Sequence, residues 1–204
     1  MTFIFLCDSS PTVKEILAKI VEKTALEARW LNTLSLLEMI GARKIGKTVC
    51  QAHPALEILE HLNDETRHAL IFKKLSRALD ERAETYLCRD EAISYFQMLD
   101  ATASEWLSEQ IGTEEPYYNY CFVTCLIERR AMQIYPVYKK ITPHPVVQRE
   151  LAQIIAEETN HRHFIEEEIK KLQQKTGVSL VEEGQKIEQD FFDIFMESVK
   201  REIS

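Results

Sequence analysis

The sequence predicts an all-α protein, built as a four-helix bundle with one long crossover and additional helices. Turn-forming residues are scarce, because the 204 residues include only five glycines and six prolines, against an average of about 12% for the two together. Four prolines stand where long helical patterns begin, a position that suits proline because its missing N–H has no acceptor there: Pro11, Pro54, Pro116 and Pro145.

These prolines and the apolar spacing predict long helices near residues 11–45, 54–80, 116–141 and 145–176. A shorter helix near 90–111 lies in the connection between the second and third of them. A last helix near 180–203 would follow a core bundle of about 11–176. Two long helices, a longer connection and two more long helices are the plan of a bundle with one crossover. No low-complexity linker divides the chain, so we expect one domain over residues 1–204.

Composition narrows the class of protein. The net charge of −8 disfavours a nucleic-acid binder, and no apolar run is long enough to span a membrane. The five cysteines are odd in number and form no Cys-x-x-Cys, which favours reduced thiols over a disulfide framework. The apolar start "MTFIFLCDSS" is short and has no basic residue, so it is a poor signal peptide. We therefore expect a cytoplasmic protein.

Two Glu-x-x-His pairs are the most informative motifs. Glu65 and His68 lie in "EHLNDETRHA", and Glu158 and His161 lie in "AEETNHRHF". Both glutamates fall on apolar stripes of their predicted helices, and a histidine three residues later lies on the same face. Each pair can therefore share one cation. Either pair alone also fits an ion pair on a charged helix surface.

Two isolated glutamates on the preceding helices favour the metal interpretation. Glu38 lies among apolar and small residues, as does Glu128, and they precede the motif glutamates by 27 and 30 residues. These intervals bring each acid to a similar height on the neighbouring helix. Four inward carboxylates would repel one another unless two divalent cations neutralised them. The predicted metal ligands, a set known from di-iron and di-manganese bundles, are Glu38, Glu65, His68, Glu128, Glu158 and His161.

The segment "DETRH" resembles the [DE]-E-x-R-H signature of the ferritin-like di-iron carboxylate superfamily, whereas "EETNH" has Asn160 where arginine is common. The likeness covers about residues 11–176 and implies a ferritin-like four-helix bundle. It also implies roles for the predicted residues. Glu38 and His68 would be terminal ligands of one metal, and Glu128 and His161 of the other, with Glu65 and Glu158 bridging. Asp64 and Glu157 would be second-shell acids, each holding a histidine of the opposite pair.

The resemblance implies a non-haem di-iron oxygenase or oxidase that activates O₂ at two iron ions and oxidises a small, apolar organic substrate. Manganese or a mixed Mn/Fe pair suits the same ligands. Rubredoxin-type cysteines are absent from the sequence, so an external electron donor is expected. We expect a solvent-shielded cavity beside the metals, bounded by Trp30 or Tyr135. The alternatives are a ferroxidase, iron-handling or peroxide-detoxifying protein, and a structural helical protein with a vestigial site.

The remaining features receive simpler interpretations. His53, His61 and His144 have no apolar setting, so helix-end or surface roles are expected for them, and His163 is expected on the surface. The last helix carries an apolar stripe that includes Phe192 and Phe195. This stripe would cover a face of the bundle or a partner in a homodimer.

Overall fold

The computed structural model describes residues 11–49, 54–82 and 84–204, and within these ranges all regular structure is helical. This confirms the all-α prediction. Among the described residues, no helix has the length and apolar composition needed to cross a membrane. The described residues form seven helices: α1 (Pro11–Val21), α2 (Thr24–Thr48), α3 (Leu56–Leu79), α4 (Arg89–Ile111), α5 (Pro116–Ile141), α6 (Pro145–Thr176) and α7 (Leu180–Glu202).

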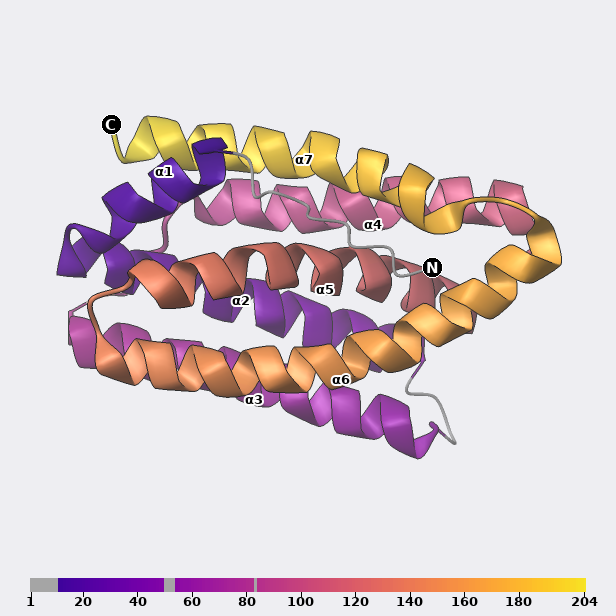
Figure 1. Cartoon of the computed structure of the whole chain (residues 1–204), viewed down its shortest axis with the longest axis horizontal. Coiled ribbons are helices and arrows are strands. Elements are labelled where there is room, and N and C mark those ends of the chain that lie inside the picture. Colours follow the sequence, from indigo (N-terminus) through magenta and orange to yellow (C-terminus); the bar gives the residue numbers. More distant parts are fainter. Residues whose placement is uncertain (1–10, 50–53, 83) are drawn as a thin grey trace.

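Six of the described helices, α2 to α7, form three layers of two (Figure 1). The middle layer consists of α2 and α5, with α3 and α6 on one side and α4 and α7 on the other. Helix α2 packs most extensively on α3, and α5 on α6, while α3–α6 and α2–α5 contacts close the ring. These four helices therefore surround a common interior. Helix α4 belongs to the connection between the two halves, as the sequence predicts.

The first predicted helix, near residues 11–45, was wrong in one respect, because the structure breaks it at Glu22 and Lys23 into α1 and α2. Lys23 has extended backbone angles, which end the helical hydrogen bonding. The break lets α1 turn back and pack on α5 and α7 (Figure 1). There α1 buries an i, i+3, i+4, i+7 stripe: Val13, Ile16, Leu17 and Ile20. A straight helix would leave this stripe beyond the end of α3.

Helix α7 covers one face of the molecule rather than standing apart. Phe192 and Phe195 are 2% exposed and pack with Tyr95 of α4 in aromatic contacts. Close packing against α5 depends on Gly184, because a Cβ there would lie 2.6 Å from the Phe122 ring. The sequence predicted that this helix covers either the bundle or a second copy, and in the structure it covers its own chain.

This close approach gives a stability prediction. Replacing Gly184 by alanine should lower the free energy of unfolding by about 1–2 kcal/mol, because overpacking outweighs the gain in helix propensity. Gly46→Ala is the matched control, since a Cβ at that helical position meets nothing within 4 Å. The control should raise the free energy of unfolding by up to about 1 kcal/mol. Urea denaturation measures both, and equal shifts in the two variants would contradict the packing argument.

Candidate metal centre

The structure brings the six predicted ligands together between α2, α3, α5 and α6. The four glutamates are each at most 8% exposed, His68 is fully buried, and His161 is the outermost member, half-buried at the edge. Their donor atoms fall into two groups, and within each group the atoms lie within 4.8 Å of one another. One group contains Glu38, Glu65, His68 and Glu158; the other contains Glu128, His161 and a seventh residue, His61.

Glu158 and Glu65 lie between the two groups. Glu158 Oε1 is 3.0 Å from Nδ1 of His68, and its Oε2 is 3.8 Å from Nδ1 of His161. Glu65 Oε1 is 3.2 Å from Nε2 of His61. The other oxygen of Glu65 faces Gly41 of α2, on the side of the first group. Each of these carboxylates therefore presents one oxygen to each group, which is the geometry that a bridging ligand requires.

Two outer acids fix the orientation of the predicted histidine ligands. Nε2 of His68 lies 2.8 Å from Glu157 Oε2, and Nε2 of His161 lies 3.0 Å from Asp64 Oδ2. These are the crossed pairings that the resemblance implies. If each Nε2 carries the proton and donates it to its acid, each Nδ1 presents its lone pair to the interior. The acids therefore select the nitrogen that is available to a cation.

Arg67 ties the two outer acids together. Its Nη2 lies 2.7 Å from Asp64 and 2.8 Å from Glu157. Partial burial opposes ionisation of both acids, but hydrogen bonds from Arg67 and the histidines hold the pKa of each below its usual value. Both acids are thus charged acceptors. The arginine of the "DETRH" segment serves both halves of the site, although the second half has Asn160 in the matching place.

Glu128 differs from two other buried acids in its hydrogen bonds. Within the described part of the chain, neither oxygen of Glu128 accepts a hydrogen bond. By contrast, one oxygen of Glu27 accepts a hydrogen bond from Tyr138, although its other oxygen accepts none. Glu188 accepts one from Tyr95 and forms an ion pair with Arg130. A buried carboxylate without hydrogen bonds is costly. A cation bound between the groups would remove this cost.

The electrostatics of these side chains agree with this fit. Burial and the neighbouring carboxylates raise the pKa of Glu38 and Glu128 well above the usual value, and they raise that of Glu65 to about 7. Glu158 differs because its contacts with His161 and His68 outweigh burial and lower its pKa to about 2. Four ionised carboxylates are thus not stable together here without added positive charge. The buried glutamates and histidines could hold a metal ion.

His61 is the residue that sequence reasoning misplaced. A helix-end or surface role was expected, but the residue is 3% exposed and lies inside the second group. His61 lies four residues before Glu65 and seven residues before His68, so the three side chains share one face of the helix. This spacing is the signal in the sequence that could have identified His61. Of the other histidines, His144 lies at the N-terminal end of α6 and His163 is exposed, as expected, while His53 lies outside the described residues.

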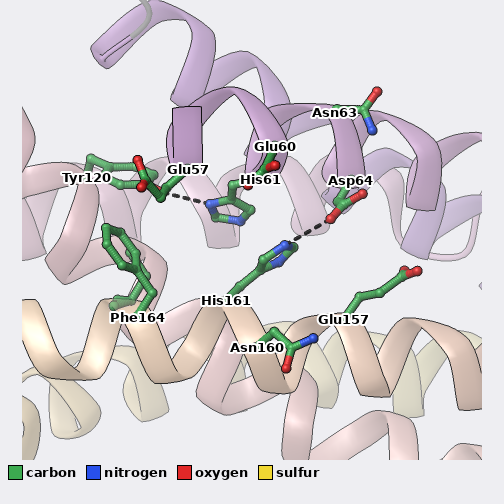
Figure 2. Close-up of a pocket in the computed structure, with 11 residues that line it drawn as sticks. Glu57, Glu60, His61, Asn63, Asp64, Tyr120, Glu157, Asn160, His161 and Phe164 are labelled. Carbon is green, nitrogen blue, oxygen red and sulfur yellow. Dashed lines mark hydrogen bonds and ion pairs between the residues drawn. The ribbon is translucent and has the colours of Figure 1, made fainter. Parts of the chain in front are cut away.

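The site has a polar side and an apolar side. On the polar side, a pocket of about 460 Å³ opens between α3 and α6, with the rings of His61 and His161 facing each other across it (Figure 2). On the other side, a cavity of about 80 Å³ touches all four site glutamates. Buried aromatic rings form much of its wall: Trp30, Tyr95, Phe96, Tyr135, Phe192 and Phe195. Both residues expected to bound a cavity, Trp30 and Tyr135, line it, and Tyr135 donates a hydrogen bond to Glu38.

Stability of the metal-free protein should depend on pH. The pKa of His68 is raised to about 10 by the carboxylates around it, against the effect of burial, and that of Glu65 to about 7. A group whose pKa is higher in the folded than in the unfolded protein stabilises the fold at pH values below its unfolded-state pKa. This contribution to stability is lost as the pH rises through the pKa of the folded state. His61, with a pKa lowered by burial to about 4, opposes this trend only below about pH 6.5.

The melting temperature of EDTA-treated protein should therefore fall between pH 6.5 and 8.5, by about 3 °C for each kcal/mol lost. Protein loaded with Mn(II) should not show this fall, because bound metal keeps the carboxylates ionised and the imidazoles neutral. Differential scanning calorimetry of both forms provides the comparison. Parallel pH profiles for the two forms would mean that these residues do not bind the metal.

Gly41 gives a test of the Glu65 position. A Cβ at Gly41 would lie 3.0 Å from Glu65 Oε2, so alanine there should displace the carboxylate by a few tenths of an ångström. We expect Gly41→Ala to weaken Mn(II) binding about tenfold or more. Gly46→Ala, in the same helix and in open space, should bind as the wild type does. Equal affinities of the two variants in competition titrations would contradict a ligand role for Glu65.

Comparisons with known protein families, curated proteins and solved structures found no match to this chain. The chemistry of the site therefore has to be inferred from its own geometry. That geometry consists of buried carboxylates and imidazoles in two adjoining groups, with Glu65 and Glu158 of the first group in contact with histidines of the second.

Proposed function

We propose that this chain is a non-haem di-iron oxygenase or oxidase, with a ferritin-like core of α2, α3, α5 and α6. It would activate O₂ and oxidise a small, apolar organic substrate. The observation that carries the proposal is the placement of Glu65 and Glu158, each with one oxygen toward each group of donors. Two adjoining groups with shared carboxylates fit a pair of metals better than a single ion.

The residues of the chain have separable tasks in this reaction. Two ferrous ions, when bound, would supply O₂ with electrons that side chains do not provide. Asp64 and Glu157 keep the proton on the outer nitrogen of each predicted histidine ligand. The Tyr135 hydroxyl holds Glu38 by a hydrogen bond and stays protonated, because burial raises its pKa far above the usual value. Together these contacts fix the ligands before substrate arrives.

The apolar cavity supports an organic substrate. Its aromatic walls exclude water, and dry surroundings direct an oxidant toward a bound molecule rather than toward solvent. The cavity volume of about 80 Å³ suits O₂ with a small or slender molecule. The carboxylate side of the site faces this cavity, so substrate would approach from the side of α4 and α7. The polar pocket on the other side remains open to an electron donor or to incoming metal.

A ferroxidase is the second candidate, and the polar pocket favours it. Glu57, Glu60, Asp64 and Glu157 line its mouth, and acidic side chains attract ferrous ions. In that case oxidised iron would be the product. The two candidates share the dimetal site and differ in the product that it releases, which is an oxidised organic molecule in the first case and oxidised iron in the second.

The proposal predicts two irons per chain and catalytic turnover without iron storage. Anaerobic Fe(II) titration should reach two equivalents, and an O₂ pulse should produce a diferric spectrum in Mössbauer measurements. Glu128→Gln should lower occupancy, because it weakens a ligand whose oxygens have no hydrogen bond among the described residues. Glu27→Gln is the matched control, since Glu27 is equally buried but hydrogen-bonded outside the site.

Product analysis and size in solution separate the candidates. A monomer or dimer that holds two irons and consumes O₂ repeatedly with a reductant and small apolar compounds supports the oxygenase. A closed shell of many subunits that accumulates hundreds of irons would support iron handling instead. Less than half a metal per chain after reconstitution would contradict both.

A further inference from the structure

His61 occupies the second group of donors, beside Glu128 and His161. Its Nε2 lies 3.2 Å from Glu65 Oε1 and 3.5 Å from Glu128 Oε1. The His61 and His161 ring centroids are 4.5 Å apart (Figure 2). The imidazole is buried, and Nε2 is aimed at the carboxylates that the proposed function assigns to metal.

The other ring nitrogen of His61, Nδ1, is within hydrogen-bond distance of a buried hydroxyl. Nδ1 lies 2.8 Å from the hydroxyl of Tyr120, which is itself 1% exposed. A proton on Nδ1 donated to Tyr120 would leave Nε2 as a lone pair facing Glu65 and Glu128. Outer acids do the same for His68 and His161, in the opposite tautomer. All three imidazoles thus have one nitrogen anchored and the other directed inward.

His61 makes the two groups unequal in composition. Without it, each group has one carboxylate and one imidazole of its own: Glu38 and His68 in the first, Glu128 and His161 in the second. Glu65 and Glu158 are shared between them. In the second half of the chain, the position four residues before Glu158 is Ile154, which is fully buried and cannot bind metal. His61 therefore has no counterpart, and it adds nitrogen to one group only.

We propose that His61 is a seventh protein ligand, bound through Nε2 to the metal held by Glu128 and His161. This inference rests on the proposed dimetal site and deepens it. The two metal positions would then differ: one has a single imidazole, and the other has two. Nitrogen-rich surroundings favour later transition metals and change the reduction potential relative to the other position. The two ions should therefore bind with different affinities and oxidise separately.

The competing explanation is a structural histidine that only links Tyr120 to Glu65. It predicts two coordinated imidazoles per chain, whereas a ligand role predicts three. Proton NMR of the Co(II)-loaded protein counts them directly. Each imidazole bound through one nitrogen keeps an N–H on the other, and the cobalt shifts that proton far outside the normal range. Exchange in D₂O identifies these N–H signals.

We expect three exchangeable, strongly shifted signals in the wild type and two in His61→Gln and His61→Asn. His163→Gln is the matched control, because His163 is an exposed histidine on the same helix as His161, and it should retain three. Co(II) titration of the two His61 variants should show one of two sites weakened at least tenfold. Tyr120→Phe should move one of the three signals, since His61 Nδ1 loses its acceptor.

The number of exchangeable signals and the number of bound Co(II) ions distinguish failure of the His61 assignment from failure of the proposed function. Two bound Co(II) ions with only two exchangeable signals in the wild type would overturn the His61 assignment and leave the dimetal site intact. Absence of Co(II) binding would overturn the proposed function itself, and the His61 assignment with it. Unchanged signals and affinities in folded His61→Gln and His61→Asn proteins would also overturn the assignment.

Discussion

Four carboxylates buried in one dry interior are the constraint on which the rest of this structure depends. Each of them would be stable alone in water, but together and desolvated they repel one another. The raised pKa of Glu38, Glu65 and Glu128 expresses this conflict in the metal-free protein. The inward nitrogens of the histidines and the cations proposed here resolve it. The same few side chains thus affect stability and would carry the proposed function.

The surrounding helices hold the site by two different means. On the polar side, Arg67 joins Asp64 and Glu157, and these acids orient His161 and His68. Charged groups can do this there because the pocket between α3 and α6 admits water. On the apolar side, α4 and α7 supply aromatic rings, and Tyr135 in the cavity wall donates a hydrogen bond to Glu38. In the proposed function, substrate and electrons would therefore reach the site from opposite faces.

Sequence reasoning located most of the helices and brought together the six ligands, because both depend on short-range periodicity. Proline positions and 3.6-residue spacing are local properties of a helix, and the folded structure retains them. Two features could not be predicted from the sequence in this way. The break at Lys23 depends on where α1 finds partners, and these belong to α5 and α7 far along the chain. His61 shares a face with Glu65, but its burial depends on Tyr120 and His161, which lie on other helices.

The two halves of the chain follow one pattern but are not equivalent. The first half has His61 and Arg67 where the second half has Ile154 and Asn160. A single arginine is sufficient because its guanidinium reaches both outer acids at once. The additional histidine, His61, lies beside one group of donors only, at the polar side of the site. The two differences between the halves therefore act differently. Arg67 serves both halves, whereas His61 would make the two proposed metal positions chemically distinct.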